Sequence, residues 1–134
     1  MRAGLTALVT VTTARRLVVT VCPRERGVVV LPLEPGGRRM RLDAAGVLGA
    51  LQALVAARRL VQRVEVREGC AGGCWGGGPN VDVRIYAVTG PGERDDHVAL
   101  GWKTYVYSLP TLASLADVID ENLPGARATR RAGR

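Results

Sequence analysis

One glycine-rich stretch decides how this chain can fold: Gly69-Cys70-Ala71-Gly72-Gly73-Cys74-Trp75-Gly76-Gly77-Gly78-Pro79-Asn80. The segments on either side of it, residues 64–67 and 81–85, alternate apolar with charged residues, which is the pattern of half-buried strands. We therefore expect a loop between the ends of two strands. Glycine accepts positive φ and lets backbone amides approach a bound group closely, whereas Pro79 stiffens the exit from the loop.

Two cysteines in this loop, Cys70 and Cys74, are candidate metal ligands. Thiolates at this spacing can bind one metal ion or an iron–sulfur cluster. The amides of Gly72 and Gly73, which lie between the cysteines, can donate hydrogen bonds to sulfur and so tune the potential of a cluster. The alternative is that both cysteines are small buried apolar residues in a turn.

The number of ligands limits the metal hypothesis. A structural zinc site or an iron–sulfur cluster takes four ligands, and the chain has three cysteines, of which Cys22 is the third. Cys22 stands at the end of a predicted strand, where it is either a ligand or a packing residue. His97, the only histidine, is either a fourth ligand or a solvated residue beside Asp95 and Asp96.

The rest of the chain reads as a mixed α/β (α+β) domain. β-Branched or alternating runs predict strands at residues 5–13, 17–22, 28–33, 38–42, 61–67, 81–88 and 97–107. We expect the first two to form a hairpin, as well as the next two and the last two. One apolar stripe predicts a helix over residues 43–59 with Asp43 as its N-cap. A second stripe predicts a helix from Ser108 or Thr111 to Leu123.

Length and composition indicate one soluble cytoplasmic domain. The 134 residues can bury one core without disulfides, and an odd, low cysteine count fits a reducing compartment. No apolar run reaches the ~18 residues of a membrane span, so we expect no membrane partner. The net charge is +7, but residues 124–134 hold four arginines and no acid, which leaves 15 basic against 12 acidic residues, or +3. We therefore expect a basic, disordered tail at 124–134 and no nucleic-acid partner.

The order helix, strand, Cys-x3-Cys loop, two antiparallel strands and helix resembles the thioredoxin-like 2Fe-2S ferredoxins. In that family the second cysteine pair has the spacing of Cys70 and Cys74, and a Gly/Pro turn like that at Pro79 leads into a strand. The segment 101–107, Gly-Trp-Lys-Thr-Tyr-Val-Tyr, is also similar to a strand of related small predicted metal-binding proteins. The resemblance covers about residues 42–123.

The resemblance implies a single thioredoxin-like domain over residues 1–123, here with extra N-terminal β-structure. It also implies a 2Fe-2S cluster or a single metal ion, electron transfer and a homodimer. Cys22 matches the first cysteine of the family's first pair. The second cysteine of that pair would stand near Leu33, where this chain has Leu-Pro-Leu-Glu.

Two functions follow. The first is a small ferredoxin-like electron carrier that binds its cluster or metal through Cys70 and Cys74, assisted by Cys22 or by a second subunit. In the dimer version each subunit gives two cysteines at a two-fold axis, and Cys22 is only a strand residue. The second is a cluster-less thioredoxin-like module that binds a redox or other protein partner. We do not expect an enzyme, because the chain has no Ser-His-Asp order, carboxylate pair or phosphate-loop signature.

Overall fold

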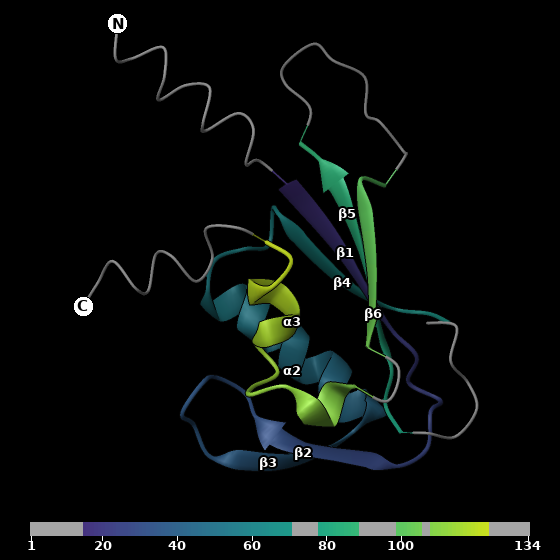
Figure 1. The fold of residues 1–134 in the computed structure, drawn as a ribbon, viewed down its shortest axis with the longest axis vertical. Helices are drawn as coiled ribbons and strands as arrows, with labels where there is room; N and C mark the ends of the chain where they lie inside the picture. Colours follow the sequence, from purple (N-terminus) through teal and green to yellow (C-terminus); the bar gives the residue numbers. More distant parts are fainter. Residues whose placement is uncertain (1–14, 71–77, 89–98, 106–107, 124–134) are drawn as a thin grey trace, which may run out of the picture.

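The computed structural model describes residues 15–70, 78–88, 99–105 and 108–123 (Figure 1). The strand expected at 5–13, the turn at 89–96 and the tail at 124–134 lie outside these ranges. Within them the chain is mixed α/β, as the sequence predicts, with a four-stranded sheet, a two-stranded sheet and two α-helices. Neither of these helices is long and apolar enough to cross a membrane.

The main sheet has the strand order β4-β1-β5-β6. Its strands are β1 (Arg15–Val21), β4 (Val64–Glu68), β5 (Val81–Ala87) and β6 (Gly101–Tyr105). β1 is parallel to β4 and antiparallel to β5, and β5 is antiparallel to β6. The antiparallel pairing of the two strands after the cysteine loop is therefore confirmed.

Two details of the predicted strands are wrong. Over residues 17–21, β1 is paired on both sides, with β4 and with β5, so it cannot form the expected hairpin with residues 5–13 in this sheet. β4 begins at Val64 and not at Val61, because the preceding residues form a turn in which the amides of Arg63 and Val64 donate to the Leu60 carbonyl at 2.9 and 2.8 Å.

A hairpin and a helix connect β1 to β4. The expected hairpin is confirmed as β2 (Val28–Pro32) and β3 (Arg39–Asp43), which pair only with each other within the described chain. The expected helix is α2 (Ala44–Ala57), and the Asp43 carboxylate caps it by accepting from the Gly46 amide at 2.7 Å. The hairpin lies below α2 in Figure 1.

The prediction of one C-terminal helix is wrong. Residues 108–123 form a short 3-10 helix, η1 (Leu109–Thr111), and one α-helical turn, α3 (Asp117–Asp120). A continuous helix is not formed because the amides of Leu115 and Ala116 donate to the carbonyls of Pro32 and Leu33, at 2.8 and 2.9 Å. These long-range hydrogen bonds replace the local ones and attach the segment to β2.

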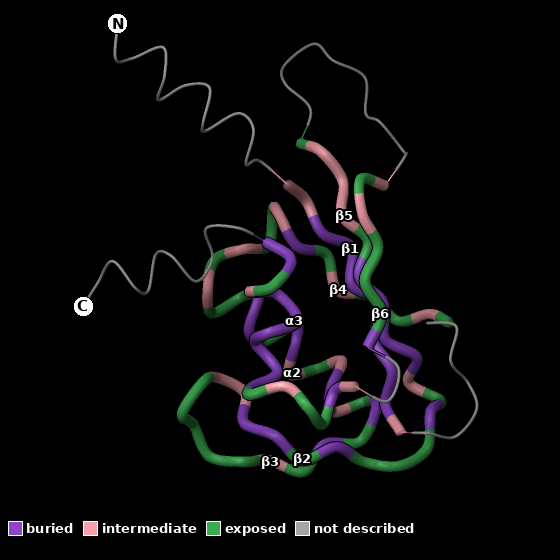
Figure 2. Tube along the Cα trace, viewed as in Figure 1, coloured by how far each residue is buried: buried purple, intermediate pink, exposed green. Residues whose placement is uncertain are grey.

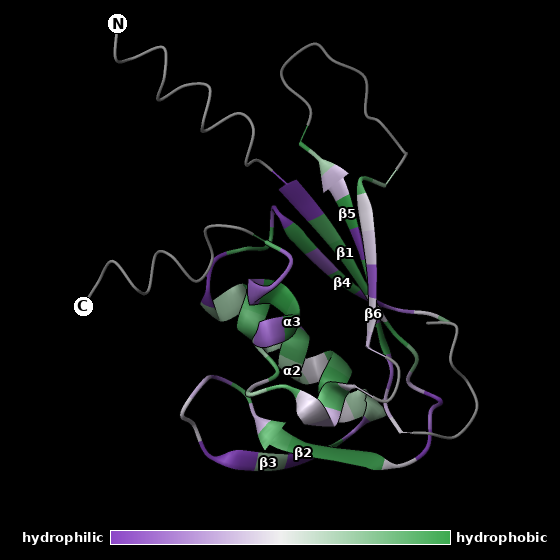
Figure 3. Ribbon diagram, viewed as in Figure 1, coloured by the Kyte–Doolittle hydropathy of each residue, from purple (hydrophilic) through white to green (hydrophobic). Residues whose placement is uncertain are grey.

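The core lies on one face of the main sheet. Both α2 and α3 lie on this side of the sheet (Figure 1), and the buried residues of strands and helices meet there (Figure 2). The hydrophobic core includes Leu17, Val19, Val21, Val29, Leu31, Val47, Leu51, Val64, Val81, Val83, Tyr105, Leu115 and Ile119. β2 is hydrophobic along most of its length, whereas β3 carries hydrophilic residues (Figure 3).

The other face of the sheet carries polar and aromatic side chains. Trp102 is 65% exposed and donates its indole N–H to the Asp82 carboxylate on the neighbouring strand. The Arg84 guanidinium lies over the Trp102 ring, 5.0 Å from its centroid, and pairs with Asp82 at 3.5 Å. Neither described helix covers this face.

Candidate functional site

The strand order brings two distant cysteines to one edge of the sheet. Val21 at the end of β1 is opposite Glu68 at the end of β4 and opposite Val81 at the start of β5. The Gly69 amide extends this pairing by donating to the Val21 carbonyl at 3.0 Å. Because parallel strands end at the same edge, Cys22 after β1 and Cys70 after β4 lie close together.

The cysteine loop also connects the strands that flank β1. β4 and β5 lie on opposite sides of β1, so the chain from Cys70 to Gly78 joins the two strands on either side of Cys22. Cys22 therefore belongs to the same end of the molecule as the loop that the sequence singles out.

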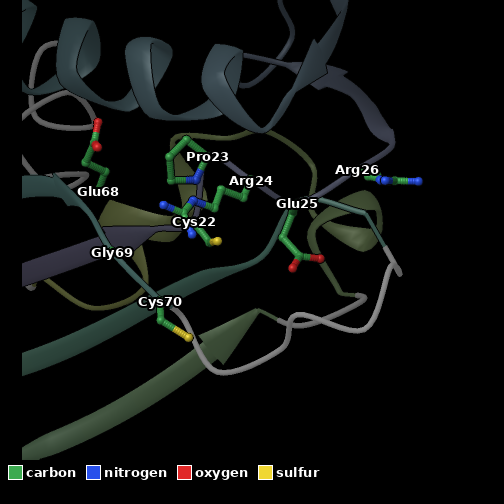
Figure 4. A pocket seen from close by; sticks show the side chains of 8 residues that line it. All are labelled: Cys22, Pro23, Arg24, Glu25, Arg26, Glu68, Gly69 and Cys70. Carbon is green, nitrogen blue, oxygen red and sulfur yellow. The ribbon is translucent and has the colours of Figure 1, made fainter.

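A cavity of about 650 Å³ opens at this edge (Figure 4). This is within the size range of protein pockets for small ligands and cofactors. The described residues that line it are Cys22, Pro23, Arg24, Glu25, Arg26, Glu68, Gly69 and Cys70. Cys22 is buried and Cys70 is exposed, so one wall of the cavity is closed to solvent and the other is accessible.

A tight turn shapes the buried wall. The Glu25 amide donates to the Cys22 carbonyl at 3.4 Å, which closes a four-residue turn with Pro23 in its second position. Proline is favoured there because its ring fixes φ near the required value. The turn reverses the chain as it leaves β1 and puts the Glu25 side chain beside Cys22, on the cavity wall.

Glu25 has an environment unlike that of an ordinary surface carboxylate. Its residue is only 8% exposed, and its Oε1 atom is buried without a hydrogen-bond partner. The described arginines form no ion pair with it, although Arg24 and Arg26 flank it in the sequence and are exposed. Burial of an unpaired carboxylate costs free energy, so this oxygen requires an explanation.

Glycines allow the two loops to approach each other. Gly27 has φ +94°, and a Cβ atom there would lie 3.3 Å from the Gly78 Cα. Gly78 itself has φ +102°. The chain after Cys22 and the exit from the cysteine loop are therefore in backbone contact, which only residues without a side chain permit in this conformation.

The structure places some of the predicted site residues and not others. It brings Cys22 and Cys70 to one cavity, whereas Cys74, Gly72, Gly73 and His97 lie outside the described residues. Among the described side chains, no three of cysteine, histidine, aspartate and glutamate are grouped closely enough to hold one ion.

Sequence reasoning missed Glu25. The signal available in the sequence is the Cys-Pro-x-Glu pattern at residues 22–25, in which a turn after a strand returns a carboxylate toward the thiol. That pattern does not reveal the burial of the carboxylate, which depends on packing at the end of the sheet.

Comparison of the chain with protein-family models, with curated proteins and with solved structures finds no match in any of the three. The chemistry of the cavity is therefore the basis for a functional proposal.

Proposed function

We propose that this protein is a small thioredoxin-like, ferredoxin-like metalloprotein that binds a 2Fe-2S cluster or a metal ion at the cavity between Cys22 and Cys70, with Cys74 as a further ligand. The observation that carries the proposal is the convergence of Cys22 and Cys70 on one cavity from strands far apart in the sequence. The order α2, β4, cysteine loop, β5, β6 and C-terminal helical segment supports the thioredoxin-like assignment.

The described residues supply the donor types of a metal or cluster site, but no three of them are grouped closely enough to hold one ion, so the proposed site requires Cys74 as a further ligand. Two thiols and a buried carboxylate oxygen without a partner line the cavity, and thiolate and carboxylate groups bind zinc and iron. Cys22 and Cys70 would hold the group, and the burial of Cys22 would exclude water from one side of it. A bound 2Fe-2S cluster would supply one-electron transfer, which makes the protein an electron carrier and not an enzyme.

The position of Cys22 favours a site built within one chain. In a site shared across a two-fold axis by Cys70 and Cys74 alone, Cys22 would be only a strand residue. Its place on the cavity wall, together with Cys70, supports its inclusion as a ligand. A homodimer is still compatible with a site of this kind, since association does not have to use the metal.

The test is to purify the full chain anaerobically and measure its ultraviolet–visible spectrum, its iron, zinc and sulfide content and its mass in solution. We expect a coloured protein with iron and sulfide, or a colourless one with stoichiometric zinc. Cys22→Ser and Cys70→Ser should each remove the metal and leave the mass unchanged. If Cys70→Ser removes both metal and dimer while Cys22→Ser spares both, the site is shared between subunits. A wild-type chain without metal would overturn the proposal.

A second function, a cluster-less module that binds a protein partner, is favoured by one observation. Trp102 is 65% exposed on a sheet face that neither described helix covers, and exposed tryptophan is enriched at protein interfaces. Trp102→Ala would then weaken partner binding without any effect on metal content. The same variant should be indistinguishable from wild type if the cavity alone carries the function.

A further inference from the structure

We propose that the Glu25 side of the cavity binds a small organic molecule through its ammonium group, and that the Glu25 carboxylate accepts the hydrogen bonds of that ammonium. The ligand is a primary amine, which is either an alkylamine or a free α-amino acid. Binding of the amine goes beyond the proposed function, because it requires neither a metal nor the thiols.

Glu25 is a buried and unsatisfied group on the cavity wall. Its residue is only 8% exposed, although its sequence neighbours Arg24 and Arg26 are both exposed. Its Oε1 atom is buried without a hydrogen-bond partner, and none of the ion pairs among the described residues involves it. A carboxylate that is removed from water needs N–H or O–H donors in place of the lost hydration. The fold itself does not supply them to Oε1.

The turn after β1 directs this carboxylate into the cavity. The Glu25 amide donates to the Cys22 carbonyl at 3.4 Å, and Pro23 lies inside the turn. In Figure 4 the Glu25 carboxylate points into the space that the Cys22 and Cys70 thiols also border, whereas the Arg26 side chain points away from it. The carboxylate is therefore presented to the cavity and not to this neighbouring arginine.

An inorganic ion held by the thiols does not satisfy Glu25. Among the described side chains, no three of cysteine, histidine, aspartate and glutamate are close enough to hold one ion, so Glu25 does not share an ion with Cys22 and Cys70. An ammonium group has no such restriction, because a single carboxylate binds it through charge-assisted hydrogen bonds. The cavity of about 650 Å³ also has the size of a pocket for a small organic molecule.

The other charges of the cavity limit the choice of ligand. Arg24, Arg26, Glu25 and Glu68 all line it, so the positive and negative charges are equal in number. Glu25 is the buried one of the four, and the others are exposed. An alkylamine would use Glu25 alone, whereas an α-amino acid would also place its carboxylate against an arginine. Substitution of Arg24 therefore separates the two kinds of ligand.

The experiment compares the wild-type full chain with Glu25→Gln, Glu68→Gln and Arg24→Gln. Glu68→Gln is the matched control, because it removes an exposed carboxylate from the same cavity. The probes are butylammonium, free alanine and butanol, which has the shape of butylammonium without its charge. Each is titrated by calorimetry at about pH 7, where the amines are protonated. A chelator is present so that no amine binds a metal, and nuclear magnetic resonance follows the Glu25 backbone amide.

We expect butylammonium to bind wild type saturably and to shift the Glu25 amide resonance. Glu25→Gln should weaken this binding by about 10- to 100-fold, as expected for loss of a hydrogen bond to a charged group, and butanol should bind wild type more weakly by a similar factor. Glu68→Gln should stay within about twofold of wild type. Without ligand, Glu25→Gln should be at least as thermostable as wild type, because it removes a buried charge, and this measurement shows that the variant folds.

Alanine and Arg24→Gln identify the kind of amine. If wild type binds alanine more tightly than butylammonium and Arg24→Gln removes that advantage, the ligand is an α-amino acid. If butylammonium binds more tightly and Arg24→Gln has no effect, the ligand is an alkylamine. Either result supports an ammonium site at Glu25.

Three results would overturn the inference. Wild type could show no saturable binding of either amine, Glu25→Gln could bind butylammonium as tightly as wild type, or butanol could bind as tightly as butylammonium. None of these results changes the metal content of the anaerobically purified chain, so they leave the proposed function standing. A chain that is purified without metal would overturn the proposed function and leave the ammonium site intact.

Discussion

Two regions of the molecule each bury a carboxylate: the junction of α2 with the C-terminal segment, and the cavity at the end of β1. The carboxylate at the junction is paired with a cation, and the one in the cavity is not. At the junction, the Arg58 guanidinium donates to Asp120 Oδ1 and to Glu34 Oε1, both at 2.5 Å. In the cavity, Glu25 Oε1 is buried with no partner. The first arrangement stabilises the fold, whereas the second leaves one buried carboxylate oxygen without a hydrogen-bond partner.

The electrostatics of the junction follow from its geometry. Burial acts to lower the pKa of Arg58, but the hydrogen bonds and negative charges of Glu34 and Asp120 outweigh it and raise the pKa above its ordinary value. The guanidinium therefore remains charged and joins the β2–β3 hairpin region to α3. The fold therefore pairs the buried Asp120 carboxylate with a cation, whereas no described arginine forms an ion pair with Glu25.

The largest effect should come from removal of the cation at the junction. Arg58→Met keeps most of the side-chain volume but leaves Asp120, whose side chain is 0% exposed, without its guanidinium. Loss of one partner of a buried pair costs about 3 kcal/mol or more. We expect the thermal midpoint to fall by roughly 10 °C in a calorimetric or circular-dichroism melt.

Arg38→Met is the matched control, because Arg38 is exposed in the β2–β3 turn. It should change the free energy of unfolding by no more than about 0.5 kcal/mol. If Arg58→Met and Arg38→Met have the same small effect, the junction does not stabilise the fold. Arg58 and Glu25 would then no longer differ in whether the pairing of a buried carboxylate stabilises the fold.

An intermediate effect should come from the backbone contact beside the cavity. Gly27→Ala puts a Cβ atom 3.3 Å from the Gly78 Cα at a residue with φ +94°. Strain of this kind costs on the order of 1–3 kcal/mol, so urea denaturation should show a loss of about 2 kcal/mol. The variant should also bind less metal, because the segment that follows Cys22 would move.

Gly49→Ala provides a control of the opposite sign. Gly49 lies within α2, and a Cβ atom there would have no neighbour within 4 Å. Alanine is favoured over glycine in a helix interior by about 1 kcal/mol, so this variant should be more stable than wild type. Equal destabilisation by both substitutions would show that the close approach at Gly27 is not the cause.

The parts of the fold that were predicted are those governed by local chemistry. The α2 stripe and its Asp43 cap are encoded within one segment, and so is the β2–β3 hairpin. The prediction of a continuous C-terminal helix was wrong because the Leu115 and Ala116 amides donate hydrogen bonds to carbonyls at the end of a distant strand. No local pattern contains that competition between hydrogen bonds.

The same distinction applies to the candidate site. Spacing alone identified Cys70 as a candidate ligand, but the importance of Cys22 depends on the parallel pairing of β1 with β4. The sequence instead suggested that residues 17–22 pair with 5–13. The burial of Glu25 is likewise a result of packing, so it was not predictable from residues 22–25 alone.

The smallest effect should come from Tyr105, a second buried polar group that the fold satisfies. Its hydroxyl donates to Glu121 Oε1 at 2.8 Å and accepts from Asn122 Nδ2 at 3.0 Å. Tyr105→Phe should cost about 1 kcal/mol at neutral pH. Burial first, and then the hydrogen bond to Glu121, raise the pKa of Tyr105 well above its ordinary value of 10.0.

The sign of the pH dependence follows from that shift. Below about pH 10 the phenol is protonated in both the folded and the unfolded chain, so its contribution to stability is complete. As the pH rises above 10, the unfolded chain releases the proton and the folded chain does not, so wild type should lose about 1.4 kcal/mol per pH unit relative to Tyr105→Phe. Urea denaturation of both proteins between pH 8 and about pH 11 measures this difference.

Glu121→Gln tests which cause of the shift dominates. It keeps the phenol and its burial but removes the charge that accepts its hydrogen bond. Because burial is the largest cause, this variant should retain most of the wild-type loss of stability above pH 10. If Glu121→Gln instead shows the same pH dependence as Tyr105→Phe, the Glu121 carboxylate is the main cause of the raised Tyr105 pKa. The pKa of Tyr105 would then be controlled mainly by a carboxylate partner, as that of Arg58 is, and not by burial of the side chain.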